Sequence, residues 1–246
     1  MILKISLISD KIIELPTGFS RYIQAIVYNF LDRISAEWLH TKGFQFEKRS
    51  FKLFTFSSIH EKPKFIRDKK LFIFPKEISF TISSPVNWLM KQVAQNIVIS
   101  EKVKIGDNIT TVSSIVTIED TKITQKKIRI KTINPIEVHS TLLKADGTKK
   151  TYYYSPAENE FNDLINKNMK KKWTALYQED CPYNLRISPV RLNLCKENIR
   201  TFKGIIIKGW TGHFWIEGES EFLEFGLMTG LGSRNSQGFG MVEMMK

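Results

Sequence analysis

The stretch GLMTGLGSRNSQGFGMVEMMK, residues 226–246, decides how this chain is interpreted. It holds five of the thirteen glycines of the chain, and they surround the polar run Ser233–Gln237. Such a cluster predicts positive φ angles or a close backbone approach, because glycine adopts these conformations at little cost. Backbone amides and one arginine suit a phosphodiester, since both donate hydrogen bonds to phosphate oxygens. The stretch therefore favours a nucleic-acid partner.

Two other glycine motifs do not fit. A dinucleotide fingerprint needs a third glycine and the order strand, loop, helix. Here position 235 is Asn, and a helical pattern at 221–228 precedes a strand-like pattern at 239–245. No Gly-Lys-Ser/Thr follows, which excludes a P-loop. A plain glycine-rich turn before a last strand fits the glycine spacing equally well, so the spacing alone leaves both interpretations open.

Size and composition set the broad class. A chain of 246 residues with 42% hydrophobic residues can form one large domain or two small ones. Its net charge of +12 favours a polyanionic partner, although a high positive charge can also serve only solubility and non-specific association. Two cysteines, Cys181 and Cys195, give neither a disulfide framework nor a zinc site, so we expect a reducing cytoplasm. Neither a signal peptide nor a membrane span is predicted.

Hydrophobic periodicity predicts two successive units with the same order of elements, β-α-β-β-α-β. In the first half we expect a strand at 2–8, a helix at 19–31, a hairpin pairing 51–57 with 70–75, a helix at 85–97 and a strand at 102–118. In the second half we expect strands at 129–133, 136–143 and 151–154, a helix opened by a capping box at Ser155–Glu158, strands at 184–195 and 202–215, a helix at 222–228 and a strand at 239–245. The predicted fold is α+β, with two tandem ferredoxin-like domains at 1–122 and 123–246.

Positive charge gathers between Lys42 and Lys76, where ten Lys or Arg residues against three acidic residues leave a net charge of +7. Eight phenylalanines are interleaved with these cations. RNA-binding surfaces combine cations that hold phosphates with aromatic rings that stack on bases. The alternative is that most of these rings fill a sheet while the lysines face water, and we expect that for the majority.

The four histidines, at positions 40, 60, 139 and 213, match no metal-site spacing, and no carboxylate cluster suits two metal ions. A nuclease built on this chain would therefore work without metal. RNA allows this, because its own 2′-hydroxyl can attack phosphorus once a base takes the proton. His40 is the best candidate, since it lies where a helical pattern ends beside the basic region. We expect the other three histidines at strand or surface positions without special chemistry.

Three sets of motifs resemble one known family. Gly230-Leu-Gly232 and Gly238-Phe-Gly240, between a helix and a last strand, resemble the C-terminal signature of the CRISPR-associated RAMP proteins. Leu39-His40, the strand Lys52–Ser57 (KLFTFS) and Val27-Tyr-Asn29 are similar to motifs of the RAMP endoribonucleases that cut CRISPR repeat transcripts. The resemblance implies two ferredoxin-like domains and an endoribonuclease that needs neither metal nor cofactor.

The resemblance also implies roles for particular residues. His40 would be the general acid and base, Lys52 would stabilise the transition state, and Tyr28 would orient or deprotonate the 2′-hydroxyl. The connection from His40 to Lys52 is longer than the family pattern, so Lys48 or Arg49 could supply the charge instead. The predicted RNA-binding residues are Gly230, Gly232, Ser233, Arg234, Asn235, Ser236 and Gly238 of the loop, together with Lys48 and Arg49.

The predicted function is cleavage of CRISPR repeat RNA (pre-crRNA) to crRNA, leaving a 2′,3′-cyclic phosphate and a 5′-hydroxyl. The alternative is a RAMP-type subunit that holds crRNA in an effector complex without cutting it. Predicted partners are the repeat RNA, other effector subunits and a second copy of the chain, and no membrane. The sequence leaves open which repeat is bound and whether the protein dimerises.

Overall fold

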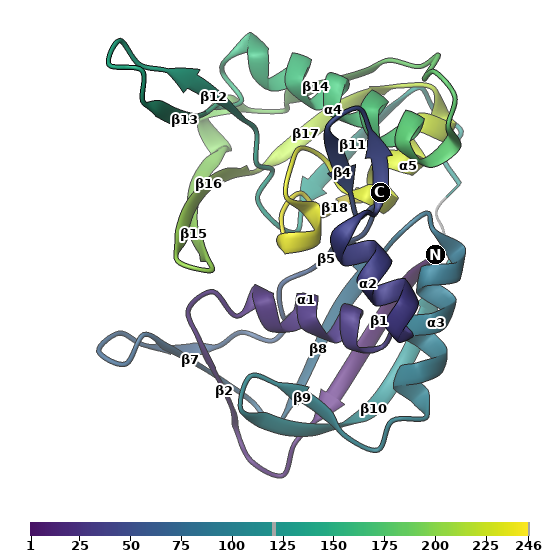
Figure 1. Cartoon of the computed structure of the whole chain (residues 1–246). Helices are drawn as coiled ribbons and strands as arrows, with labels where there is room; N and C mark the ends of the chain where they lie inside the picture. The colour runs from purple at the N-terminus through teal and green to yellow at the C-terminus, as the bar shows by residue number, and fades with distance from the viewer. Residues whose placement is uncertain (120–121, 246) are drawn as a thin grey trace.

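The computed structural model describes residues 1–119 and 122–245, which form two stacked halves (Figure 1). The N-terminal half is the lower one in that view, and the C-terminal half lies above it. The predicted domain boundary, between residues 122 and 123, falls in the connection from β10 (Asn108–Ile118) to β11 (Lys127–Thr132). Residues 120 and 121 lie outside the described residues, so this boundary stays a prediction.

The N-terminal half is built on one antiparallel sheet with the strand order β5-β8-β1-β10-β9. Its elements are β1 (Ile2–Ile8), α1 (Ser20–Asn29), β5 (Thr55–Phe56), β8 (Glu77–Ser83), α3 (Asn87–Val98), β9 (Val103–Ile105) and β10. Counted along the β-α-β-β-α-β unit, the sheet order is second, third, first, fourth. This is the ferredoxin-like order, and the prediction for this half is confirmed.

The alternation of buried and more exposed side chains along β1 explains how the helices pack on one face of the sheet. Leu3, Ile5 and Leu7 are at most 1% exposed and form one core with apolar side chains of α1 and α3. Successive strand residues point to opposite faces, so the alternation covers one face of the sheet and leaves the other open. Helix α1 presents Ile23, Ile26 and Val27 to this core at helical spacing.

The basic region differs from the predicted hairpin. Residues 71–74 form β7, which pairs with β2 (Ile13–Pro16) and β6 (Lys64–Ile66), whereas β5 pairs with β8. The prediction of 70–75 as the partner of 51–57 is wrong. The physical reason for the observed pairing is that Phe74 is buried in the core against Phe19, and this contact ties β7 to the start of α1. Among the eight phenylalanines only Phe65 is exposed, at 45%, as expected for rings that fill the sheets.

Between α1 and β5 the chain adds α2 (Arg33–Thr41) and a short hairpin of β3 (Phe44–Phe46) and β4 (Arg49–Phe51). Asp32 caps α2 by accepting a 2.9 Å hydrogen bond from the amide of Ser35. His40 lies in the last turn of this helix.

The C-terminal half repeats the same plan, with the antiparallel order β14-β17-β11-β18. Its main elements are β11, α4 (Asn159–Tyr177), β14 (Leu185–Pro189), β17 (His213–Gly218), α5 (Ser220–Thr229) and β18 (Val242–Met244). Two hairpins are added, β12 (His139–Leu143) with β13 (Lys149–Tyr153), and β15 (Lys196–Phe202) with β16 (Ile205–Thr211), and two 3₁₀ turns, η1 (Leu192–Leu194) and η2 (Asn235–Gln237). The order is again second, third, first, fourth, so the tandem ferredoxin-like fold is confirmed.

Helix α4 begins at Asn159, three residues after the predicted first helical residue. The amide of Ser155 does donate to the carboxylate of Glu158 at 2.6 Å, which is one arm of a capping box. However, Glu158 itself is extended, with φ −97° and ψ 137°, so Ser155–Glu158 closes a turn and the helix starts after it. No helix of the described residues is long and apolar enough to cross a membrane.

Candidate active site

The glycine loop, residues 230–240, is a closed structure that requires glycine. The amide of Leu231 donates to the carbonyl of Gly240 at 2.9 Å, and the amide of Gly240 donates to Pro135 at 2.8 Å. Gly240 has φ +70°, and a Cβ atom there would lie 1.9 Å from the carbonyl oxygen of Leu231. A side chain at this position would therefore prevent the loop from closing.

A buried lysine of α4 holds the loop from inside. The ammonium of Lys172 donates to the carbonyls of Gly230 at 2.8 Å and Gly232 at 3.1 Å, and to Oδ1 of Asn235 at 2.7 Å. Burial lowers the pKa of Lys172 to about 7, because a charge loses its hydration there. The carboxamide of Asn235 also donates to Leu231 and Phe239, so this predicted RNA-binding side chain lies inside the loop.

The loop is seated on the N-terminal half. The side chain of Gln24 in α1 donates to the carbonyl of Ser236 at 2.6 Å, and Thr55 of β5 donates to Phe239. Asn134 joins both halves, since its amide donates to Phe56 and to Gly238 at 2.8 Å each. The loop is thus placed against α1 and β5 by contacts from both halves.

The three predicted catalytic residues come from neighbouring elements. The rings of Tyr28 and His40 lie 6.0 Å apart in an edge-on arrangement, and Tyr28 contacts Phe54 in the same way. His40 is exposed and Tyr28 is half-buried. Burial raises the pKa of the Tyr28 phenol to about 12, so the hydroxyl keeps its proton near neutral pH.

Lys52 is brought back to the end of α2. Its ammonium donates to the backbone carbonyl of His40 at 2.9 Å and to the hydroxyl of Ser50 at 3.1 Å. Gly43, with φ +62°, makes the turn, and a Cβ atom there would lie 2.6 Å from the carbonyl of Phe51. The β3–β4 hairpin therefore absorbs the long connection that separates His40 from Lys52. Partial burial lowers the pKa of Lys52.

A hollow of about 400 Å³, which we call the groove, joins Lys52 to the glycine loop. One wall is residues 49–54, and the other is residues 232–237 with Asn168 and Lys172 of α4. A neighbouring side hollow of about 380 Å³ is lined by Arg49, Ser233, His139 and the lysines 167 and 171 of α4. Predicted residues from both ends of the chain thus meet at one cationic surface.

Not every predicted residue lines the groove. Arg49, Lys52, Gly232, Ser233, Arg234, Asn235 and Ser236 line it. Lys48 is exposed in the turn of the β3–β4 hairpin, and Gly238 packs against Phe56 of β5. Neither His40 nor Tyr28 is among the described residues that line the groove. His40 is linked to it by the hydrogen bond that its backbone carbonyl accepts from Lys52. The direct role of each residue stays a prediction.

Sequence reasoning missed two parts of the site. Lys172 is the first, although its spacing from Phe161, Ile165 and Met169 puts it on the buried face of α4. Glu137 and His139 were also missed. The imidazole Nδ1 of His139 lies 2.5 Å from a carboxylate oxygen of the fully buried Glu137. Both residues fall in the predicted strand 136–143, where residues two positions apart share one face, and that spacing was the available signal.

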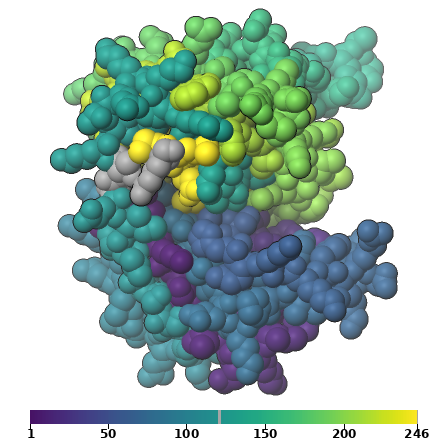
Figure 2. Space-filling model, turned by 180° about the vertical axis from the view of Figure 1, so that it is seen from behind, coloured from purple at the N-terminus to yellow at the C-terminus, as the bar shows by residue number. Residues whose placement is uncertain are grey.

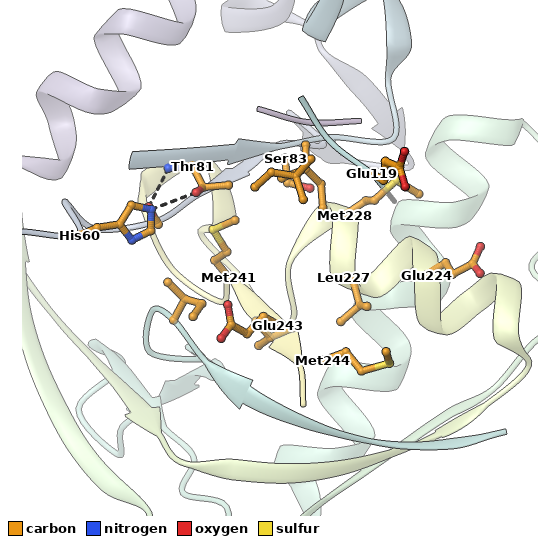
Figure 3. Close-up of a pocket in the computed structure, with 15 residues that line it drawn as sticks. His60, Thr81, Ser83, Glu119, Glu224, Leu227, Met228, Met241, Glu243 and Met244 are labelled. Atoms are coloured by element: carbon orange, nitrogen blue, oxygen red, sulfur yellow. Dashed lines mark hydrogen bonds between the residues drawn. The ribbon is translucent and has the colours of Figure 1, made fainter. Parts of the chain in front are cut away.

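A third hollow, of about 420 Å³, lies where β18 meets the N-terminal sheet (Figure 3). We call it the methionine hollow, because Met228, Met241 and Met244 line it. His60 points into it and lies 3.0 Å from the hydroxyl of Thr81, and burial lowers the pKa of His60. From behind, the yellow C-terminal residues fill the junction between the two halves (Figure 2).

Metal-ligating side chains do not gather in this part of the molecule. Over residues 1–119 and 122–245, no three His, Cys, Asp or Glu side chains are close enough to hold an ion together. Both cysteines in this part of the chain are free thiols.

Two ferredoxin-like domains in tandem, with a glycine-rich loop that precedes the last strand and faces a cationic wall, define the RAMP class of proteins. Comparison with known proteins narrows this class. The sequence profile of the family "CRISPR associated protein Cas6, C-terminal" matches residues 118–244, more than half of the chain. The chain belongs to this family of CRISPR-associated endoribonucleases.

Three similar proteins support the assignment over the whole length. CRISPR-associated endoribonuclease Cas6 1 of Methanocaldococcus jannaschii is 27% identical over 248 residues, covering 98% of this chain and 92% of the relative. The solved structure "CRISPR associated protein Cas6" is 25% identical, with a TM-score of 0.79 and coverage of 100% and 99%. The structure titled "An RAMP protein binding different RNA substrates" has a TM-score of 0.81 at 23% identity, covers both chains fully and supports the fold.

Proposed function

We propose that this protein cleaves CRISPR repeat RNA without a metal ion, by attack of the 2′-hydroxyl on the adjacent phosphate. The products would be a 2′,3′-cyclic phosphate and a 5′-hydroxyl. Support comes from the family, from the net charge of +12, and from the cationic groove beside His40. The observation that carries the proposal is the 2.9 Å bond from the Lys52 ammonium to the backbone carbonyl of His40, which fixes this charge at the end of α2.

The chemistry divides among three residues. His40 takes the proton of the 2′-hydroxyl or gives one to the leaving 5′-oxygen, because an exposed imidazole can do both near neutral pH. Lys52 stabilises the negative charge that develops on the phosphorane. Since the Tyr28 phenol keeps its proton, we assign it to orienting the substrate as a hydrogen-bond donor and not to deprotonating the 2′-hydroxyl.

The RNA strand would lie in the groove, with phosphates held by Arg49 and by the loop residues Ser233 and Arg234. Arg234 is available for this, because its guanidinium is only loosely paired, with Nε 3.9 Å from a carboxylate oxygen of Glu137. Gly230, Gly232 and Gly238 would serve by letting the backbone pass close to its neighbours.

The test is incubation of the protein with a panel of synthetic repeat RNAs in excess EDTA, followed by mapping of both new ends. We expect one cut per repeat, a cyclic phosphate upstream and a 5′-hydroxyl downstream. A 2′-deoxy substitution at the scissile nucleotide should abolish the cut. Loss of activity in EDTA would overturn the metal-free mechanism, and a cut that survives the deoxy substitution would overturn 2′-hydroxyl attack.

A second function has one observation in its favour. Most of the loop bonds hold the loop itself and join the two halves, as expected of a scaffold that grips RNA without cutting it. In that case the protein would bind repeat RNA in the same assay and leave it intact. Association with other effector subunits, dimerisation and a cytoplasmic location stay predictions.

A further inference from the structure

The Glu137–His139 pair faces the substrate side of the molecule. Glu137 is fully buried, and one carboxylate oxygen lies 2.5 Å from Nδ1 of His139. The close fit depends on Gly232, where a Cβ atom would lie 2.4 Å from the carbonyl of Glu137. That carbonyl accepts the amide of Ser233 at 2.8 Å, so the pair is fixed to the glycine loop.

The hydrogen bond to Glu137 fixes the tautomer of the ring. A carboxylate can only accept, so Nδ1 of His139 carries a proton, and in the neutral ring Nε2 is then an acceptor. His139 lines both the groove and the side hollow, where a side-chain exposure of 26% leaves the ring accessible.

Asn168 of α4 adds a second acceptor at the same place. It lines both hollows, it is only 8% exposed, and its Oδ1 has no hydrogen-bond partner among the described residues. A buried polar atom without a partner costs stability, so a ligand that donates to it would recover that cost. Around these two acceptors the groove and the side hollow carry Arg49, Lys167 and Lys171, which suit phosphates.

An RNA backbone matches this arrangement, because each phosphate is flanked by a ribose whose 2′-hydroxyl can donate. We propose that one ribose 2′-hydroxyl away from the scissile nucleotide donates a three-centre hydrogen bond, shared between Nε2 of His139, which Glu137 orients, and Oδ1 of Asn168. They would be specificity-determining residues that distinguish RNA from DNA in the groove. The inference rests on the proposed function for its substrate and adds a recognition site to it.

The test uses the repeat RNA that binds wild-type protein most tightly in the panel, with a 2′-deoxy scissile nucleotide so that it is not cut. Single 2′-deoxy substitutions are then placed at every other position, and affinities are measured. We expect one position outside the scissile nucleotide where wild-type affinity falls about fivefold, the effect of one lost hydrogen bond. His139→Ala and Asn168→Ala should each bind more weakly and show no further loss at that position.

Two controls keep the result specific. His213→Ala removes another histidine of the C-terminal half and should keep the wild-type pattern, whereas Glu137→Gln, which frees the ring tautomer, should weaken the penalty at the same position. If His139→Ala is poorly folded by its melting curve, His139→Phe takes its place, since it keeps an aromatic ring but has no hydrogen-bond acceptor.

The outcomes separate the two proposals. If wild-type protein binds no RNA of the panel, the proposed function and this inference both fall. If it binds and cuts, but the position-specific penalty persists in His139→Ala, only the inference falls. A penalty that follows removal of base amino groups instead of 2′-hydroxyls would also overturn it, because the acceptors would then be contacting a base.

Discussion

The groove and the methionine hollow have similar volumes, about 400 and 420 Å³, and a histidine lines each of them. His139 lines the groove, and His60 lines the methionine hollow. The same C-terminal segment lines both, with residues 232–237 in the groove and residues 241–244 in the methionine hollow. Their charge differs in sign. The groove collects Arg49, Lys52 and Arg234, whereas the methionine hollow contains three glutamates among apolar side chains (Figure 3).

This comparison shows that neither volume nor the presence of an imidazole identifies the site. Phosphate binding requires cations and donors, and glutamates repel the same strand. His60 and His40 are both exposed, but His60 is bonded to Thr81, whereas the backbone carbonyl of His40 holds the Lys52 ammonium. We therefore propose that the chemistry takes place at His40.

The largest effect is expected for His40→Ala. Loss of a general acid and base should lower the single-turnover cleavage rate about 10³-fold, because proton transfer contributes at this scale. RNA affinity, measured by filter binding on non-cleavable RNA, should change little. His60→Ala is the matched control and should cut within about twofold of wild type. Equal losses in the two variants would contradict the contrast between the two hollows.

Lys52→Ala should follow, with a loss of about 10²-fold in the cleavage rate, since one charged donor to the phosphorane is removed. Arg49→Ala should act mainly on affinity, because its side chain lines both the groove and the side hollow, where it can hold a phosphate. Lys48→Ala, in the exposed hairpin turn, should have the smallest effect of the three. A rate loss in Lys48→Ala or Arg49→Ala that exceeds the loss in Lys52→Ala would assign stabilisation of the transition state to that residue instead of Lys52.

These residues also show how far the sequence could be interpreted. Period-two and helical patterns were enough for both ferredoxin-like units, because the alternation of β1 and β11 states which face is buried. Partners of short strands were not predictable, since two to four residues carry too little pattern, and β7 was assigned to the wrong strand. Buried polar contacts such as those of Lys172 depend on segments 58 to 63 residues away, so local spacing could only hint at them.

Gly240→Ala tests whether the loop closes as described. A Cβ atom 1.9 Å from a backbone oxygen forces the chain apart, and overpacking of this kind costs about 2 kcal/mol. The melting temperature should fall by several degrees and RNA affinity should fall with it. Gly147→Ala is the control, because its φ is also positive (+76°) but no atom lies within 4 Å of the added Cβ. Comparable losses in both variants would assign the effect to φ alone.

The smallest effect concerns the pH dependence of stability through Lys172. Its pKa of about 7 lies below the ordinary value of 10.5, so between these pH values the unfolded chain binds a proton that the folded chain has released. Stability therefore rises with pH across this window, by at most about 1.4 kcal/mol per unit. Urea unfolding of wild type and Lys172→Met at pH 7 and pH 9 measures the difference in slope. We expect the free energy of unfolding of wild type to rise relative to that of the variant between pH 7 and pH 9. An equal change in both proteins would show that the buried amine keeps its proton throughout. The variant isolates the contribution of the amine to loop stability, because Met fills a similar space without donating to Gly230, Gly232 or Asn235.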